Sequence, residues 1–80
     1  MIQSYIMTKI ETGKEAEISS KIKNIKNIRE SHFTYGTYDL LIKASFEKNE
    51  DLDDFVFNVV RKIPGVKETV TVIVAKTIVS

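Results

Sequence analysis

The chain has 80 residues, a formal net charge of +1 and no cysteine, which fits one small domain over residues 1–80 and excludes disulfides and thiolate-ligated metals. The near-neutral charge argues against direct binding to nucleic acid, because phosphate binding needs an excess of basic residues on one face. No apolar run approaches the roughly 20 residues of a membrane helix and the N-terminus lacks the basic region of a signal peptide, so we expect a cytoplasmic protein without a membrane partner.

The first expected element is a strand over residues 2–10, where two sets of side chains alternate with the period of two that a strand requires. Thr12 and Glu15 follow with the spacing of a capping box, which predicts that a helix starts at this point. This helix should bury a stripe of isoleucines that share one of its faces. The stripe consists of Ile18, Ile22 and Ile25.

Two further strands are expected over residues 28–35 and 38–46. Only Gly36 and Thr37 separate them. A connection of two residues fits a hairpin with a primed turn, in which glycine supplies the required positive φ. The middle of the chain therefore predicts a tight antiparallel hairpin.

A second helix is expected to start near Asn49 or Asp51, where acidic residues suit the positive end of the helix dipole. Pro64-Gly65 should end it, since proline cannot continue a helix and glycine favours its C-terminus. A fourth strand is expected over residues 66–74, and residues 76–80 either extend it or form a short fifth strand. The apolar stripe of this helix is Leu52, Phe55, Val56, Val59, Val60 and Ile63.

The two halves of the chain repeat each other, since residues 25–31 correspond to residues 63–69 and Ile18 corresponds to Val56 at the same offset. The chain therefore reads as two βαβ units in tandem. Such units, with right-handed crossovers, interleave into one four-stranded antiparallel sheet with both helices on one face. The sequence thus predicts an α+β fold, the ferredoxin-like βαββαβ sandwich.

This sheet is expected to be apolar on both faces, although the helices can cover only one. Tyr5 and Met7 alternate with isoleucines in the first strand, and Leu41 alternates with apolar neighbours in the third. In the last strand Val70 and Val72 share one face. Monomers rarely expose such a large apolar patch, so we predict a homodimer that packs sheet to sheet. The alternative is that sheet curvature and the C-terminal tail cover the second face within one chain.

Conventional catalytic and metal-binding patterns are missing from the sequence. Its one histidine, His32, lies mid-strand beside an aromatic residue, where a structural role is commoner than a catalytic one. The acidic residues 47–51 match no metal loop and fit a solvated helix start. The glycines are isolated and form no phosphate-binding loop. We therefore expect no enzyme activity, no cofactor and no metal site.

The segment Tyr35-Gly36-Thr37-Tyr38-Asp39 places two aromatic residues, a glycine and a carboxylate around a hairpin tip. Backbone N–H groups exposed at a tight turn can bind a carboxylate, and Asp39 can bind an ammonium group. An α-amino acid carries both charges close together, so it suits this segment, with hydroxyls of a nearby strand as further partners. On this hypothesis, Asp39→Ala abolishes ligand binding and leaves the fold intact. The alternative is that Asp39 only hydrogen-bonds the turn and that the tyrosines pack at a sheet edge.

Two motifs are more specific in combination than alone: YGTYDLLIK at residues 35–43 and RKIPGVKETVT at residues 61–71. Together they resemble the effector domain of the Lrp/AsnC transcription regulators. The resemblance implies the ferredoxin-like fold, homodimers that pair through their sheets, and higher homo-oligomers such as octamers or decamers. It also implies that a small effector, typically an amino acid, binds where dimers meet. The implied ligand-binding residues are Gly36, Thr37, Tyr38 and Asp39 in the turn, with Thr69 and Thr71 on the last strand of a neighbouring subunit.

Full-length members of that family carry an N-terminal helix-turn-helix domain, whereas here the similarity to the effector domain begins near the first residue. We therefore expect a stand-alone amino-acid-binding regulatory module that does not bind DNA directly. Such a module could also join full-length Lrp/AsnC regulators in mixed oligomers. Two alternatives remain open: a small dimeric ferredoxin-like enzyme, and an oligomerisation partner that has no ligand of its own.

Overall fold

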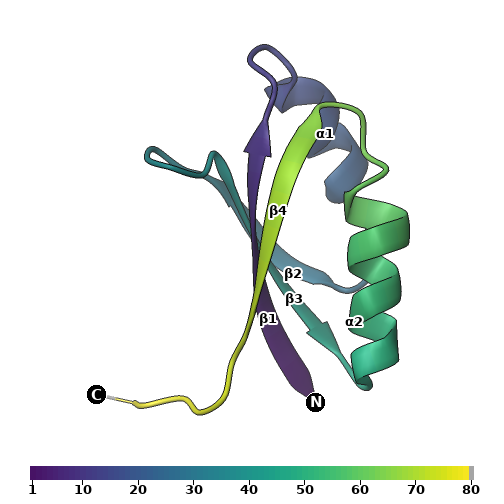
Figure 1. Ribbon diagram of the computed structural model, residues 1–80, viewed down its shortest axis with the longest axis vertical. Helices are drawn as coiled ribbons and strands as arrows, with labels where there is room; N and C mark the ends of the chain where they lie inside the picture. The colour runs from purple at the N-terminus through teal and green to yellow at the C-terminus, as the bar shows by residue number, and fades with distance from the viewer. Residues whose placement is uncertain (80) are drawn as a thin grey trace.

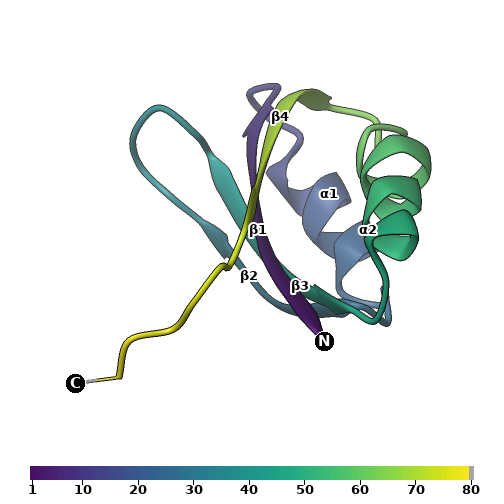
Figure 2. The same ribbon diagram turned by 60° about the horizontal axis from the view of Figure 1, so that its bottom comes forward.

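The computed structural model describes residues 1–79 and has the β-α-β-β-α-β order expected from the sequence (Figure 1). Its strands form one antiparallel sheet with the order β2-β3-β1-β4. Both helices lie against the same face of this sheet (Figure 2). The predicted ferredoxin-like α+β fold is therefore confirmed. The elements are β1 (Ile2–Ile10), α1 (Glu15–Ile22), β2 (Ile28–Phe33), β3 (Leu40–Phe46), α2 (Asn49–Phe55), the π-helical turn η1 (Val56–Val60) and β4 (Val66–Ile73).

The core lies between the helices and one face of the sheet, as the strand periodicity requires. In β1 every second side chain from Ser4 to Ile10 is buried, and the side chains between them are half-buried. Ile6 lies opposite Ile42 of β3, and both side chains are fully buried. The buried Ser4 hydroxyl donates a hydrogen bond to Ala44 O at 3.1 Å, so this polar group has a partner inside the core.

The apolar stripe predicted for the second helix faces the core. The helix begins at Asn49, one of the two predicted positions, and its helical segments end before Pro64-Gly65. In η1 the hydrogen bonds lengthen to five residues, since Arg61 N–H donates to Val56 O at 3.0 Å. The buried members of the stripe are Leu52, Phe55, Val56, Val60 and Ile63, and Val59 is partly buried.

The connection from α2 to β4 packs closely against the start of α1. Gly65 has a φ of +99°, and a Cβ at this position would lie 2.9 Å from Lys14 Cβ. Gly65 O also accepts a hydrogen bond from Glu11 N–H at 2.8 Å. Only glycine combines this backbone conformation with such a close approach, so the turn packs directly against the segment that begins α1.

The capping box predicted at Thr12 and Glu15 is wrong. α1 begins at Glu15 with Lys14 at its N-cap position, and no side chain caps its first turn. A backbone turn precedes the helix instead, because Lys14 N–H donates to Glu11 O at 3.2 Å. Thr12 therefore lies in this turn, outside the helix. Ile25, the last member of the predicted stripe, follows the helix and packs against the core.

The two-residue turn predicted at Gly36-Thr37 is also wrong. Residues 34–39 belong to neither strand and form a wider loop. Thr34 N–H donates to Asp39 O at 2.8 Å, and the Thr34 hydroxyl donates to Tyr38 O at 2.8 Å. These bonds satisfy the backbone at the base of the loop, so the ladder between β2 and β3 does not continue to its tip.

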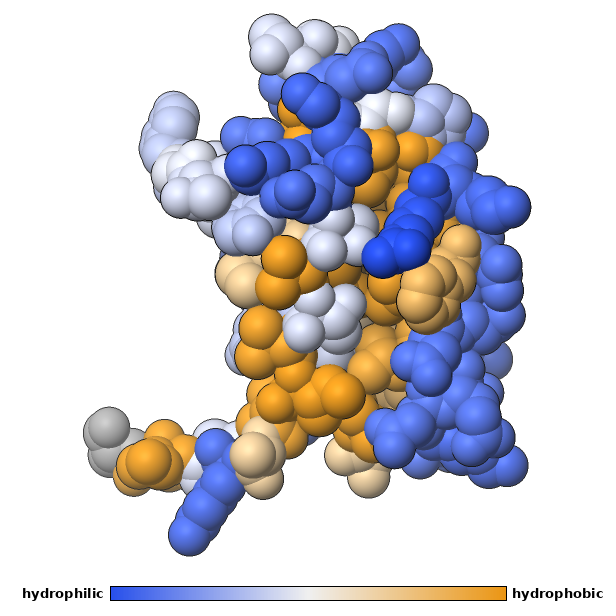
Figure 3. All heavy atoms as spheres, viewed as in Figure 1, coloured by the Kyte–Doolittle hydropathy of each residue, from blue (hydrophilic) through white to orange (hydrophobic). Residues whose placement is uncertain are grey.

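The sheet face turned away from the helices, here called the open face, carries apolar side chains along its middle. Met7 lies at its centre, opposite Leu41 of β3 and Val70 of β4. The space-filling view looks at the β4 edge of the sheet, and hydrophobic residues run along β4 there (Figure 3). Further hydrophobic residues between β4 and α2 belong to the side that the helices cover, not to the open face. The apolar members of the open face are Tyr5, Met7, Leu41, Val70 and Val72.

The C-terminal segment does not cover this face within one chain. β4 ends at Ile73, and the chain then leaves the body of the domain (Figures 1 and 2). Ile78 and Val79 are 88% and 87% exposed. The predicted extension or fifth strand at residues 76–80 is therefore wrong for residues 76–79, and Ser80 lies outside the described residues.

Candidate functional site

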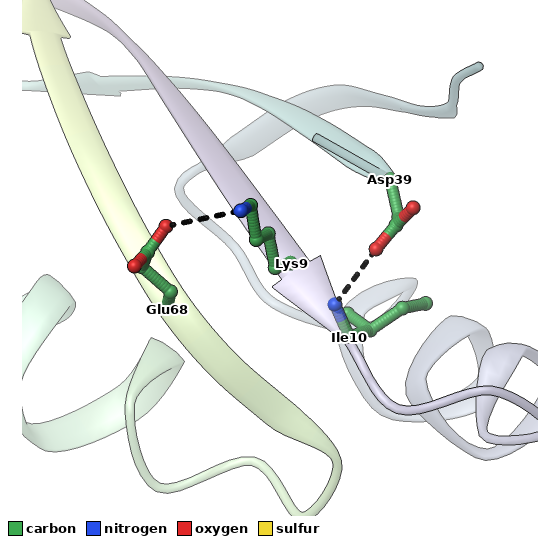
Figure 4. Close-up of polar contacts among 4 residues, drawn as sticks. All are labelled: Lys9, Ile10, Asp39 and Glu68. Carbon is green, nitrogen blue, oxygen red and sulfur yellow. Dashed lines mark hydrogen bonds and ion pairs between the residues drawn. The ribbon is translucent and has the colours of Figure 1, made fainter. Parts of the chain in front are cut away.

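Asp39 connects the loop between β2 and β3 to the end of β1. Its backbone N–H donates to Thr8 O at 2.9 Å. Its carboxylate oxygen Oδ2 accepts a hydrogen bond from Ile10 N–H at 3.1 Å, and the other oxygen points away from Ile10 (Figure 4). The side chain is half-buried, so one oxygen stabilises the fold while the other is available to a ligand.

Asp39 lines a pocket of about 350 Å³, here called the Asp39 pocket. Glu15 from the first turn of α1 supplies a second carboxylate, and Thr12 and Thr34 supply hydroxyls. No basic side chain is among the residues that line it, so its charge favours a cationic group such as an ammonium. The lining residues are Ile10, Thr12, Glu15, Phe33, Thr34, Tyr35 and Asp39.

The other residues predicted in the turn lie at or near the loop tip. Gly36 and Thr37 are exposed, and Gly36 has a φ of +129°. Among the described residues, neither N–H donates a backbone hydrogen bond, so both can reach a ligand or water. Tyr38 is half-buried, with Lys9 Nζ 5.8 Å from the centre of its ring. Of the turn residues predicted for the site, only Asp39 lines the pocket.

Thr69 and Thr71 lie on the other side of β1. They pair with Thr8 and Ile6 across the β1–β4 ladder, whereas Asp39 precedes β3. Both threonines line a separate pocket of about 290 Å³ between β4 and α2, here called the β4–α2 pocket. One chain therefore does not bring the two groups of predicted site residues together. The lining residues are Leu52, Asp53, Val56, Phe57, Arg61, Thr69, Thr71 and Ile73.

Sequence reasoning missed several residues of the Asp39 pocket. Thr12 and Glu15 were assigned to a capping box, and their spacing carried no other signal. Phe33 and Tyr35 belong to β2 and to the loop, and their aromatic character was the only indication of a site. These residues converge only because α1 packs beside the loop, which the local sequence cannot reveal.

His32 lies on the open face and is exposed, with Nε2 3.2 Å from a carboxylate oxygen of Glu30. His32 therefore lies on the surface of the sheet. Within residues 1–79 no group of three or more potential ligands is arranged to hold a metal ion. In the same range, no helix has the length and apolar character needed to cross a bilayer.

Comparison with known proteins identifies the family. The family model described as the Lrp/AsnC ligand binding domain matches residues 3–80. The chain belongs to the Lrp/AsnC ligand-binding domain family. It is 38% identical over 74 residues to the HTH-type transcriptional regulator FL11 of Pyrococcus abyssi, a match that covers 92% of this chain and 48% of the regulator. The chain spans about half the length of the curated relatives it matches.

Solved structures agree with this Lrp/AsnC assignment. The crystal structure of FFRP-DM1 has a TM-score of 0.88 and 32% identity, over 92% of this chain and 99% of that one. The regulator NMB0573 of Neisseria meningitidis, solved in complex with L-Met, has a TM-score of 0.90 over 99% of this chain and 53% of its own. Its identity is 21%, so this second likeness supports the fold alone. The chain therefore belongs to a family of ligand-binding domains, and the curated relatives that it matches are transcriptional regulators.

Proposed function

We propose that this Lrp/AsnC domain binds an α-amino acid at a site that two copies complete, and that the bound state regulates full-length Lrp/AsnC proteins. One copy contributes the Asp39 pocket, and another contributes Thr69 and Thr71 on β4. One observation carries the proposal. The Asp39 carboxylate keeps one oxygen directed away from its bond to Ile10 and lies in a pocket lined by no basic side chain.

The charge of the pocket supports an ammonium group as one half of the ligand. Asp39 and Glu15 both line it, and a hydrogen bond from an ammonium to a carboxylate is roughly twice as strong as one between neutral groups. The volume of about 350 Å³ falls within the usual range of small-molecule pockets. An amino acid therefore fits both the charge and the size.

The ligand carboxylate needs hydrogen-bond donors that the pocket supplies only in part. The Thr34 hydroxyl already donates to Tyr38 O at 2.8 Å, which leaves Thr12 and Tyr35 as the remaining hydroxyls of the lining. The exposed N–H groups of Gly36 and Thr37 can also bind an anion. Hydroxyls of Thr69 and Thr71 from a second copy would complete the set of donors. This shortage is the chemical reason for placing the site between copies.

The open face supports the association of copies. Val70 and Val72 are 37% and 45% exposed and adjoin Met7 at the centre of the sheet. Packing two open faces together removes this apolar surface from water. We infer a homodimer formed through this face, and higher oligomers in which dimers bring the Asp39 pocket to the β4–α2 pocket of a neighbour.

Titration calorimetry with the common amino acids, beginning with L-Met, tests the ligand. Asp39→Asn is the informative variant, because asparagine can still accept the hydrogen bond from Ile10 N–H while its side chain carries no charge. We expect Asp39→Asn to weaken binding by about 10- to 100-fold, because the ligand ammonium loses a charge-assisted hydrogen bond to the Asp39 carboxylate. Asp51→Asn is the matched control, since it removes an exposed carboxylate from α2 and should bind like the natural chain.

Three outcomes contradict the proposal. Failure of every amino acid to bind rejects the ligand class and favours a ligand-free oligomerisation partner. Equal binding by Asp39→Asn and the natural chain rejects the role of the carboxylate. Tight binding by a single chain at all protein concentrations, measured by light scattering during the titration, rejects the shared site.

Membership of the Lrp/AsnC family supports a proposed cellular role. An amino acid that bridges copies would change which oligomers form, and mixed oligomers with full-length regulators would transmit that change to DNA. Such a role places the protein in the cytoplasm together with those regulators. Co-purification with a full-length Lrp/AsnC protein tests this regulatory role separately. We expect the amount of the co-purified regulator to change when the same amino acid is present.

A further inference from the structure

A second pocket, here called the α1–β2 cleft, lies between α1 and β2. β2 is an edge strand of the sheet. The cleft has a volume of about 260 Å³, enough for a molecule of a few carbon atoms but below the size of most drug-like ligands. Its lining combines apolar side chains with two serines, two cations and one carboxylate. The lining residues are Ser19, Ile22, Lys23, Ile28, Arg29, Glu30, Ser31, Phe33 and Leu40.

Ser31 is the unusual residue of this cleft. It lies opposite the fully buried Ile42 of β3, so its side chain faces the helices. Its Oγ atom is buried, and within the described residues it has no hydrogen-bond partner. A buried hydroxyl without a partner destabilises a protein by about 1–3 kcal/mol, and native structures rarely retain one without a reason. A ligand in the cleft would supply the missing partner.

The rim of the cleft is positively charged. Arg29 lies at a register shift in the β2–β3 ladder, between Ile28 and Glu30, and such bulges redirect side chains. Lys23 lies at the C-terminal end of α1. Neither cation forms an ion pair within residues 1–79.

The acidic residue of the cleft does not cancel this charge. The carboxylate of Glu30 lies 3.2 Å from His32 Nε2, and both residues lie on the open face. The C-terminal end of a helix contributes only about half a negative charge. The lining of the cleft thus carries two cations, Lys23 and Arg29, against the single carboxylate of Glu30.

We propose that the α1–β2 cleft is a second ligand site, which takes a small organic acid with an apolar body. The carboxylate binds between Lys23 and Arg29, where Ser31 Oγ can donate to it. The apolar body packs on Ile22 and Leu40. Inorganic phosphate lacks the apolar body, so we expect it to bind more weakly than such an acid.

This site is independent of the proposed amino-acid site, although the two are neighbours. The side chain of Phe33 lines both the cleft and the Asp39 pocket. The cleft offers cations, whereas the Asp39 pocket offers two carboxylates. The two sites therefore select opposite charges, and a ligand without an ammonium group should prefer the cleft.

Nuclear magnetic resonance titration of the full chain tests the proposal with a matched pair of probes. One probe is 4-methylpentanoate, and the other is 4-methylpentanamide, which has the same carbon skeleton without the charge. We expect the acid to cause saturable shifts at the amides of Ser19, Lys23 and Ser31, and the amide probe to bind about tenfold or more weakly. Inorganic phosphate serves as the third probe.

Variants separate the two sites. Lys23→Gln together with Arg29→Gln should remove the preference for the acid over its amide. Ser31→Val should weaken binding of the acid while keeping a side chain suited to a strand. Asp39→Asn should bind the acid as the natural chain does, even if no amino acid binds to the Asp39 pocket.

Several results overturn the proposal. These are the absence of saturable shifts up to about 10 mM acid, equal binding of the acid and the amide, and shifts confined to the surroundings of Asp39. Equal binding by the double variant and the natural chain also overturns it. If Ser31→Val does not fold, the Lys23→Gln and Arg29→Gln double variant alone tests the proposal. Both of these positions are exposed, so their substitution should not disturb the fold.

Discussion

Asp39 is predicted to serve both the fold and the ligand, and two substitutions separate these roles. Asp39→Ala removes the acceptor for Ile10 N–H, a bond of 3.1 Å in a partly buried position. Hydrogen bonds to charged groups contribute about 1.5–3 kcal/mol, so we expect the free energy of unfolding to fall by about that amount. A domain of this size has a total stability on the order of 4–12 kcal/mol, so the loss is measurable. Asp39→Ala should therefore keep the fold, as the sequence-based prediction expects, but with a lower free energy of unfolding.

Asp39→Asn keeps an acceptor for the same N–H group and should lose about 1 kcal/mol or less. Urea denaturation followed by circular dichroism measures both variants, at one protein concentration because oligomers gain stability with concentration. Calorimetry on the same samples measures ligand binding, which Asp39→Ala should abolish and Asp39→Asn should weaken. If Asp39→Ala is as stable as the natural chain, the bond to Ile10 contributes nothing to folding and the reasoning fails.

Three further predictions concern assembly, backbone and ligand. Met7→Asp at the centre of the open face should reduce the mass found by light scattering to that of one chain, and an unchanged mass would reject packing through this face. Gly65→Ala should lower the free energy of unfolding by at least about 2 kcal/mol, because its Cβ would meet Lys14. Gly36→Ala has open space around it and should lower the free energy of unfolding less in the same denaturation assay. Thr71→Val should weaken amino-acid binding about tenfold with no change in oligomer mass, and unchanged affinity in calorimetry would remove the hydroxyl from the site.

The fold was predictable because each element follows from a local period. Ile18 and Val56 correspond in the internal repeat, and both are buried against the sheet. The stripe from Leu52 to Ile63 has the helical period and faces the core. Alternation in β1 predicted which side chains the helices cover. These regularities depend on neighbours in the chain, so the sequence alone carries them.

The loop around Gly36 was not predictable in detail, because its shape depends on bonds to distant residues. Asp39 is held by Thr8 O and by Ile10 N–H, both about 30 residues earlier in the chain. The hydroxyl of Thr34 satisfies a backbone carbonyl that a tight hairpin would have paired differently. Turn rules consider only the residues between two strands, so they predicted a narrower connection.

The spacing of residues along the chain was enough to predict the β-α-β-β-α-β order, the apolar stripes and the apolar character of the second sheet face. The order of the strands in the folded sheet was needed to show that the Asp39 pocket and the threonines of β4 lie on opposite sides of β1. The tertiary structure also brought Glu15 of α1 beside Asp39 and left Ser31 Oγ without a partner under α1. Strand order and helix packing bring together residues that are far apart in the chain. A local sequence pattern does not show which distant residues become neighbours.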